Sequence, residues 1–327
     1  MIRFERVVKR FPGGVEAVAD LSLEVAEGET LVLLGTSGSG KTTTMKMVNR
    51  LIEPTSGRIL VDGTDVMRLD PIALRRRIGY AIQHIGLFPH MSVAENVAVV
   101  PRLLRWSKEK TDQRVDQLLE IVGLGPDEFR HRYPSQLSGG QRQRVGVARA
   151  LAADPPIVLM DEPFGALDPI TRGQLQDEFI ELESEIRKTV VFVTHNVFEA
   201  VKMGDRIALM DRGRLQQLAT PSELVERPAN EFVDQFLGQQ RFQLALVTRT
   251  IQSILPEHET HEEQPETAGD GPCLRARDSL IAGLDLFKQT GRHTLPVCRR
   301  GRLVGELSKR RLLHEITEAL GEAGTEE

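Results

Sequence analysis

A glycine-rich loop constrains the fold of this chain more than any other stretch. The loop runs from Gly35 to Thr43 with the sequence GTSGSGKTT, after the apolar run 30–34 and before a helical pattern at 44–52. A buried strand, a glycine loop that ends in Lys-Thr and a helix together form the phosphate-binding P-loop. The glycines let several backbone N–H groups point at one anion, and the helix N-terminus adds its dipole. The flanking strand and helix disfavour the alternative, a flexible Gly/Ser turn.

The polar side chains of this loop match the chemistry of a nucleoside triphosphate. Lys41 is long enough to reach β- and γ-phosphates, and the hydroxyl of Thr42 is a ligand for Mg²⁺. The sequence therefore predicts a phosphate site with a magnesium ion at the turn from strand to helix. The residues expected to bind the nucleotide there are Gly35, Ser37, Gly38, Ser39, Gly40, Lys41, Thr42 and Thr43.

Two further apolar runs end in polar residues. The run 156–160 leads into Asp161 and Glu162, and the run 189–194 leads into His195. Ligands of α/β sheets bind at the carboxyl ends of the strands, so we expect these side chains beside the P-loop. Asp161 is then placed to reach the magnesium ion, Glu162 to polarise an attacking water and His195 to contact the γ-phosphate. A solvated turn and a structural histidine are the alternatives.

Three other stretches have both a functional and a structural interpretation. Phe11 lies between predicted strands at 2–8 and 21–25, where its ring either stacks on an adenine or packs in the core. The loop 86–91 carries apolar side chains, which indicates a contact surface or a loop folded onto its own domain. The Ser-Gly-Gly turn at 138–140 precedes a helical pattern and is either a second anion site or an ordinary helix start.

Composition and charge narrow the class of protein. The chain has 327 residues, enough for about two domains, and a net charge of -5 argues against a nucleic-acid partner. The first residues lack an apolar signal core, and no apolar run approaches the ~20 residues that span a bilayer, so any membrane role is expected through a partner. Cys273 and Cys298 are able to form one disulfide, but two reduced thiols in a cytosolic protein are the favoured interpretation.

The pattern of elements predicts two domains of unequal size. An α/β domain is expected over 1–237, with a helical subdomain at about 84–150. A connecting segment with an acidic linker follows at 238–272. A β-α-β-β-α pattern occupies 273–320, before a tail at 321–327, and is too short to bury much core alone.

These motifs together resemble the ATP-binding subunits of ABC importers. The P-loop, the LSGGQ sequence at 137–141, the Asp-Glu pair and the histidine occur in the order and spacing of that family over residues 1–237. The resemblance implies a P-loop NTPase fold of the ABC type that binds ATP and Mg²⁺. It also makes Phe11 the adenine-stacking aromatic, Glu162 the catalytic base and Gln83 the glutamine that senses the metal and the water.

The resemblance further implies a dimeric mechanism. Two ATP molecules are sandwiched between two such chains, and hydrolysis drives the movement of transmembrane permease subunits that work with an extracytoplasmic solute-binding protein. The chain is then expected at the cytoplasmic face of the membrane, with the apolar loop 86–91 receiving the permease. Asn196 departs from the family's usual Asp, which we expect to tune the rate. The implied sites are the magnesium ligands Thr42, Gln83 and Asp161, the signature Ser138, Gly139, Gly140 and Gln141 acting on the partner's ATP, and the D-loop Asp168.

Finer features are similar to the uptake systems for glycine betaine, choline and other quaternary amines. The stretches 51–57 and 82–90 carry this likeness, and 271–313 resembles a single CBS repeat. A single repeat is expected to pair with its copy in a second subunit, and Arg311 disfavours nucleotide binding by that repeat, which leaves ionic-strength sensing as the regulatory hypothesis. The alternatives are an importer ATPase for another small solute, a soluble ABC ATPase, or a CBS-type regulator with a vestigial ATPase.

Overall fold

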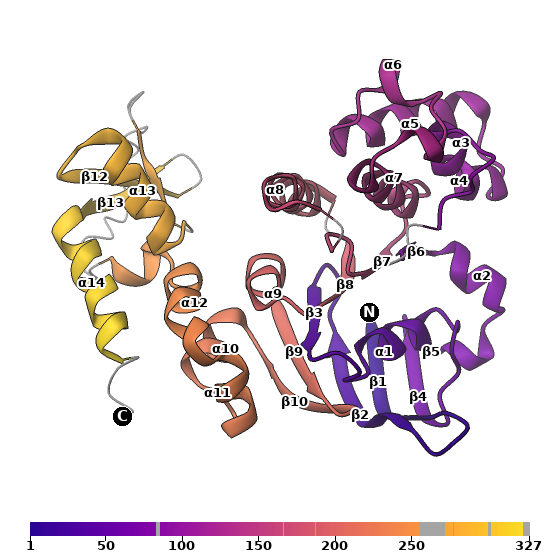
Figure 1. The fold of residues 1–327 in the computed structure, drawn as a ribbon, viewed down its shortest axis with the longest axis horizontal. Helices are drawn as coiled ribbons and strands as arrows, with labels where there is room; N and C mark the ends of the chain where they lie inside the picture. The colour runs from indigo at the N-terminus through magenta and orange to yellow at the C-terminus, as the bar shows by residue number, and fades with distance from the viewer. Residues whose placement is uncertain are drawn as a thin grey trace. The chain divides into compact units, whose positions relative to one another are not determined.

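The chain separates into two compact units in the computed structural model. The structure describes residues 1–82, 86–165, 167–186, 188–255, 272–276, 278–299 and 302–322. Unit 1 is Met1–Leu218, and unit 2 is Ala219–Glu327, drawn in orange to yellow in Figure 1. This boundary lies earlier than the predicted one near residue 237.

A six-stranded sheet carries the P-loop of unit 1. The central strands β3, β8 and β7 are parallel and buried along their whole length, as their continuous apolar sequences predict. The order across the sheet is β10 (Arg214–Ala219), β9 (Arg206–Asp211), β3 (Thr30–Gly35), β8 (Thr189–Thr194), β7 (Ile157–Asp161) and β6 (Ile78–Ala81).

A second, antiparallel sheet shares one core with the first. Its order is β2 (Glu16–Val25), β1 (Ile2–Arg10), β4 (Ser56–Val61) and β5 (Thr64–Asp65). The apolar face of α1 (Lys41–Val48) contributes Met45 and Met47 to a cluster that also holds side chains of both sheets. The helix that follows the P-loop is therefore fixed by the largest core of the unit.

The helical pattern predicted over residues 92–124 is broken in the structure. It forms α3 (Val93–Val97), α4 (Val99–Leu103) and α5 (Lys108–Ile121). Pro101 has no N–H to donate to the carbonyl of Val97, which separates α3 from α4. Figure 1 shows α3 to α7 gathered in one group. The remaining helices of unit 1 are η1 (Val66–Arg68), α2 (Pro71–Arg76), α6 (Pro126–Phe129), η2 (Pro134–Gln136), α7 (Gly139–Leu151), α8 (Pro169–Ile186) and α9 (Val197–Met203).

Unit 2 begins with helices that the sequence assigned to the first domain. Arg241 Nε donates to the carbonyl of Val225 over 2.8 Å, and Ser222 Oγ to that of Thr248 over 3.4 Å. These bonds join α10 to α12, which explains the early boundary. No described helix of either unit is long and apolar enough to cross a membrane. The helices here are α10 (Pro221–Glu226), α11 (Glu231–Leu237), η3 (Gly238–Gln240), α12 (Arg241–Thr248) and η4 (Ile251–Ile254).

The last part of unit 2 has the predicted β-α-β-β-α order. It consists of β11 (Leu274–Arg275), α13 (Leu280–Thr290), β12 (Thr294–Arg299), β13 (Arg302–Ser308) and α14 (Lys309–Glu322), and the strands form one sheet. Ile251 and Ile254 of η4 pack in the same apolar cluster as Leu274, Phe287 and Leu312. The segment before the acidic linker therefore belongs to this small core.

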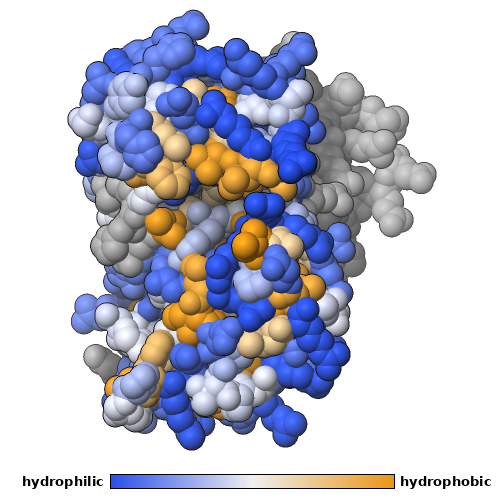
Figure 2. Space-filling model, turned by 90° about the vertical axis from the view of Figure 1, so that its right-hand side faces the viewer, coloured by the Kyte–Doolittle hydropathy of each residue, from blue (hydrophilic) through white to orange (hydrophobic). Residues whose placement is uncertain are grey.

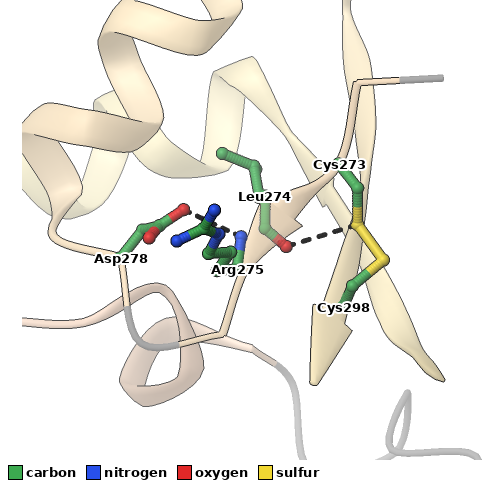
Figure 3. Close-up of a disulfide and its surroundings, with 5 residues drawn as sticks. All are labelled: Cys273, Leu274, Arg275, Asp278 and Cys298. Carbon is green, nitrogen blue, oxygen red and sulfur yellow. Dashed lines mark hydrogen bonds between the residues drawn. A yellow bond between two sulfur atoms is a disulfide. The ribbon is translucent and has the colours of Figure 1, made fainter. Parts of the chain in front are cut away.

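The two cysteines are joined, so the prediction of reduced thiols is wrong. β11 pairs in parallel with β12, with Arg275 opposite Cys298. This register brings the Cα atoms of Cys273 and Cys298 to 6.2 Å, and the disulfide between them is shown in Figure 3. Composition alone does not reveal this pairing, because it depends on which strands lie side by side.

Candidate nucleotide site

The P-loop follows β3 and requires glycine at two positions. Gly35 and Gly40 have φ angles of 150° and 98°, which L side chains rarely adopt. A Cβ atom on Gly35 would collide with the carbonyl oxygen of Met210, and one on Gly40 with that of Ala17. The loop is therefore able to curl against two neighbouring strands only because these residues lack side chains.

The ammonium group of Lys41 is held inside the curl of the loop. Its Nζ donates to the carbonyl oxygens of Gly35 and Thr36 over 2.8 and 2.7 Å, and the residue is 6% exposed. Burial lowers the pKa of Lys41, while the carboxylates of Glu162 and Asp161 oppose that shift. A phosphate bound in the loop would place negative charge beside this cation and so offset the desolvation that lowers its pKa.

A turn that the sequence analysis missed supports the loop from the next strand. Thr36 Oγ1 donates to Asp211 Oδ1 over 3.3 Å, and the backbone N–H of Gly213 donates to the carbonyl of Ser39 over 3.1 Å. The sequence signal was the Asp-Arg-Gly turn between β9 and β10. Its function as a support became visible only when the structure placed β9 beside β3.

Thr42, in the first turn of α1, lies beside Asp161, the last residue of β7. Thr42 Oγ1 donates to Asp161 Oδ1 over 2.9 Å, and Asp161 is only 2% exposed. Burial raises the pKa of Asp161, against the lowering effect of the Thr42 hydrogen bond and of Lys46. Two hard oxygen atoms at the mouth of a phosphate loop suit the ligand preference of Mg²⁺.

Glu162 and His195 meet beside this pair. Glu162 has φ of 47°, and its backbone N–H donates to the carbonyl of Val193 over 3.0 Å. His195 Nδ1 lies 3.1 Å from Glu162 Oε1. Asn196 accepts the backbone N–H of Phe198 over 2.9 Å with its amide oxygen and so caps α9, as an aspartate would. The structure therefore brings the acidic pair and the histidine to one place.

The signature residues close the first turn of α7 on themselves. Ser138 Oγ accepts the N–H of Gln141 over 3.2 Å, and Gln141 Oε1 accepts the N–H of Ser138 over 2.9 Å. Gly140 lies against the predicted D-loop, which includes Leu167 beside Asp168, since a Cβ atom on Gly140 would be 2.7 Å from Leu167 Cδ2. Asp168 caps α8 through the N–H of Thr171, and this hydrogen bonding lowers its pKa.

Two predicted site residues are less defined by contacts. Gln83 lies outside the described residues, so its prediction is neither supported nor opposed. Phe11 is half-buried, with Lys9 Nζ 5.0 Å from the centre of its ring. The apolar loop 86–91 is partly exposed, and Asn96 braces it by accepting the N–H of Phe88 over 2.8 Å.

A glutamine of α7 reaches the backbone of Glu162 and was missed by the sequence analysis. Gln143 Nε2 donates to the backbone carbonyl of Glu162 over 3.1 Å, and the residue is 5% exposed. Gln143 lies three positions after Gly140, one helical turn along α7, which is the only sequence signal that pointed to it.

Comparisons with known proteins place these features in one family. The family model described as "ABC transporter" matches residues 18–165. The glycine betaine/carnitine/choline transport ATP-binding protein OpuCA of Bacillus subtilis is 55% identical over 241 residues, which cover 74% of this chain and 63% of that protein. The glycine betaine uptake system ATP-binding protein YehX of Escherichia coli is 48% identical over 316 residues, which cover 96% of this chain and 100% of that protein.

A solved structure agrees with the fold described above. The dimeric ATP-binding cassette MJ0796, in a post-hydrolysis state bound to ADP and Pi, superposes with a TM-score of 0.62 at 33% identity, covering 67% of this chain and 98% of that one. The chain therefore belongs to the ABC transporter family, as one of its ATP-binding proteins with a P-loop NTPase fold.

Proposed function

We propose that this chain is the ATP-hydrolysing subunit of an importer for a quaternary-amine osmoprotectant such as glycine betaine, choline or proline betaine. The observation that carries the cargo is the similarity to YehX along 96% of the chain, unit 2 included. The cassette alone does not select a cargo, because the sulfate/thiosulfate import ATP-binding protein CysA of Nocardia farcinica is 47% identical over 226 residues. An importer of another small solute is therefore the alternative.

The site residues divide the chemistry among them. Lys41 and the P-loop amides bind the β- and γ-phosphates, and Phe11 stacks on the adenine. Mg²⁺, when held by Thr42 and Asp161, neutralises charge on the transferred phosphoryl group. Glu162 accepts the proton of the attacking water, and His195 orients the Glu162 carboxylate through the 3.1 Å contact.

Two chains are needed for a complete site in this proposal. Ser138 and Gly140 present the N-terminus of α7 to the γ-phosphate of ATP held by a second copy, and Asp168 lies at the seam. The dimeric state of the solved relative supports this arrangement. Glu162→Gln is expected to trap an ATP-bound dimer at double mass on a sizing column, and a monomer at saturating ATP and Mg²⁺ would contradict the sandwich.

The partner surface is proposed on the loop 86–91 and on α4. Figure 2 shows apolar patches on the side of the molecule that carries α2 to α6 in Figure 1. Phe88 of the loop 86–91 is 40% exposed and Leu103 of α4 is 52% exposed, although both are large apolar residues. We assign the loop to contact with transmembrane permease subunits. This contact places the chain at the cytoplasmic face of the membrane. The permease subunits receive solute from an extracytoplasmic solute-binding protein.

The segment 273–320 of unit 2 is proposed to act as a single CBS-like repeat that pairs with its copy in the dimer. Arg311 Nε donates to the carbonyl of Ile254 over 2.7 Å, so its guanidinium serves the fold of the unit. This supports a dimerising or salt-sensing unit over a nucleotide-binding one. Removal of the residues after Gln240 is expected to weaken dimerisation without ATP, and undiminished dimerisation would refute the pairing.

Uptake of labelled glycine betaine across a salt series tests the proposal. Cells that lack other betaine carriers would carry either the intact chain or Lys41→Ala. Uptake that requires intact Lys41 supports both ATPase and cargo, and competition by choline and proline betaine ranks the substrates. Equal uptake by the two chains would reject this cargo and turn the search to other solutes.

A further inference from the structure

The backbone N–H and C=O groups of Glu162 are hydrogen-bonded to two different elements. Its N–H donates to Val193 of β8, and its C=O accepts from the side chain of Gln143 on α7. Between these anchors the residue has φ of 47°, in the left-handed region that costs energy for a non-glycine residue. The direction of the Glu162 carboxylate therefore depends on bonds that hold its backbone in this conformation.

Burying the Gln143 side chain costs more desolvation free energy than burying an apolar side chain of similar size. Its Oε1 atom is buried and has no hydrogen-bond partner among the described residues, while Nε2 makes the bond to Glu162. An apolar side chain of similar size would avoid the desolvation of an unsatisfied acceptor. The glutamine is thus explained by its contact with Glu162 better than by packing.

The helix that carries Gln143 also carries the signature turn. Gly140 lies in the first turn of α7 and contacts the D-loop residue Leu167, and Gln143 lies one turn further along. A shift or rotation of the start of α7 therefore moves the Gln143 amide relative to the Glu162 carbonyl. The amide links the part of the chain that meets the second nucleotide to the residue that activates water in the first.

We propose that Gln143 is a positioning residue that couples the placement of the signature helix to the orientation of Glu162. When α7 is correctly placed, the hydrogen bond from Gln143 Nε2 fixes the strained backbone of Glu162, and the Glu162 carboxylate faces the attacking water. When α7 is displaced, the bond lengthens and the carboxylate loses its alignment. This inference rests on the proposed ATP hydrolysis and assigns to Gln143 a function distinct from that of the signature residues themselves.

The first test replaces the amide by an apolar group of similar size. Gln143→Leu in the full chain is expected to lower the kcat for ATP hydrolysis by at least about tenfold, with the KM for ATP and Mg²⁺ within about twofold of the original value. The matched control is Gln176→Leu on α8, because Gln176 is a second buried glutamine of unit 1, 5% exposed. The control is expected to retain kcat, and a Gln143→Leu chain that also retains kcat would overturn the inference.

A second variant separates hydrogen bonding from packing. The side chain of Gln143→Glu donates to the Glu162 carbonyl only when it is protonated, and burial raises the pKa of a carboxyl group. The ratio of its kcat to that of the unsubstituted chain is expected to rise at least about fivefold from pH 8.5 to pH 6, while the ratio for Gln143→Leu stays flat. A flat ratio for Gln143→Glu would overturn the inference even if Gln143→Leu folds poorly.

The unsubstituted chain distinguishes the two levels of the argument. If it does not hydrolyse ATP with Mg²⁺ under any tested condition, the proposed function fails. If it hydrolyses ATP and both Gln143 variants behave like it, only the positioning function of Gln143 fails.

Discussion

The two units bury different kinds of side chain. Unit 1 buries charged groups at its site, among them Lys41 and Asp161, and has a large apolar core shared by two sheets. Among the described residues of unit 2, the buried side chains are apolar, and a disulfide joins the residue before β11 to β12. A large core offsets the cost of desolvating charges, whereas a small one relies on covalent constraint.

This difference predicts that function and stability respond to different substitutions. Changes at the polar site of unit 1 should remove activity with little loss of stability. Changes at the disulfide of unit 2 should lower the stability of that unit with little loss of ATP hydrolysis. The experiments below test this separation.

The largest effect is expected from Lys41→Ala. Loss of the ammonium group removes the charge that binds the β- and γ-phosphates, so ATP hydrolysis should fall about 1,000-fold. Phosphate release measures the rate. The control is the surface variant Lys202→Ala, which loses an ion pair with Asp177 and a hydrogen bond to the carbonyl of Gly173. Residual hydrolysis within tenfold of the control would contradict the assigned site.

Glu162→Gln should have the next largest effect on the rate. The amide cannot accept a proton from the attacking water, so hydrolysis should fall about 100-fold while ATP still binds. Equilibrium binding of labelled ATP, compared with phosphate release, separates the two steps. If binding falls as much as hydrolysis, Glu162 is a binding residue and the assignment of the base is wrong.

Cys273→Ser should act on unit 2 alone. The disulfide closes a loop with a sequence separation of 25, and its loss should cost about 3 kcal/mol of the stability of that unit. Limited proteolysis follows unit 2 while phosphate release follows unit 1, and Cys298→Ser is the matched variant. A parallel loss of ATP hydrolysis would show that the two units are not independent.

The redox state of the same disulfide in cells tests the proposed location at the cytoplasmic face. Disulfides are rare in a reducing cytosol. Thiol labelling of freshly lysed cells measures how much of the chain carries the disulfide and how much carries free thiols. In a separate experiment, a reductant should lower the stability of the intact chain and leave the stability of Cys273→Ser unchanged. If reductant affects both equally, it acts at some place other than this bond.

The smallest effect is expected from Asp161→Asn on the chain without nucleotide. Burial raises the folded pKa of Asp161, so the folded state binds more protons than the unfolded state, and stability falls as pH rises from the ordinary pKa through the folded one. At neutral pH the neutral amide, which still accepts from Thr42, should therefore raise the Tm of the nucleotide-free chain slightly. An unchanged difference in Tm from pH 4 to pH 7 would contradict this sign.

The sequence by itself determined the nucleotide-binding part of this protein. The strand, the glycine loop and the helix from residue 30 onward, and the strand ends at Asp161 and His195, are local patterns whose geometry follows from backbone sterics and apolar periodicity. Their order and spacing were sufficient to indicate the family. The β-α-β-β-α order of the last part of the chain was predicted for the same reason.

Only the tertiary structure decided which distant residues meet. The bond from Gln143 to Glu162, the support of the P-loop by the turn at Asp211, and the pairing of Cys273 with Cys298 all join elements far apart in the sequence. The break of the helical pattern at 92–124 instead follows from a local signal, Pro101. The early boundary of unit 2 again depends on contacts between separate elements, those of α10 with α12. Such contacts depend on strand order and helix packing, which hydrophobic periodicity along a single chain does not encode.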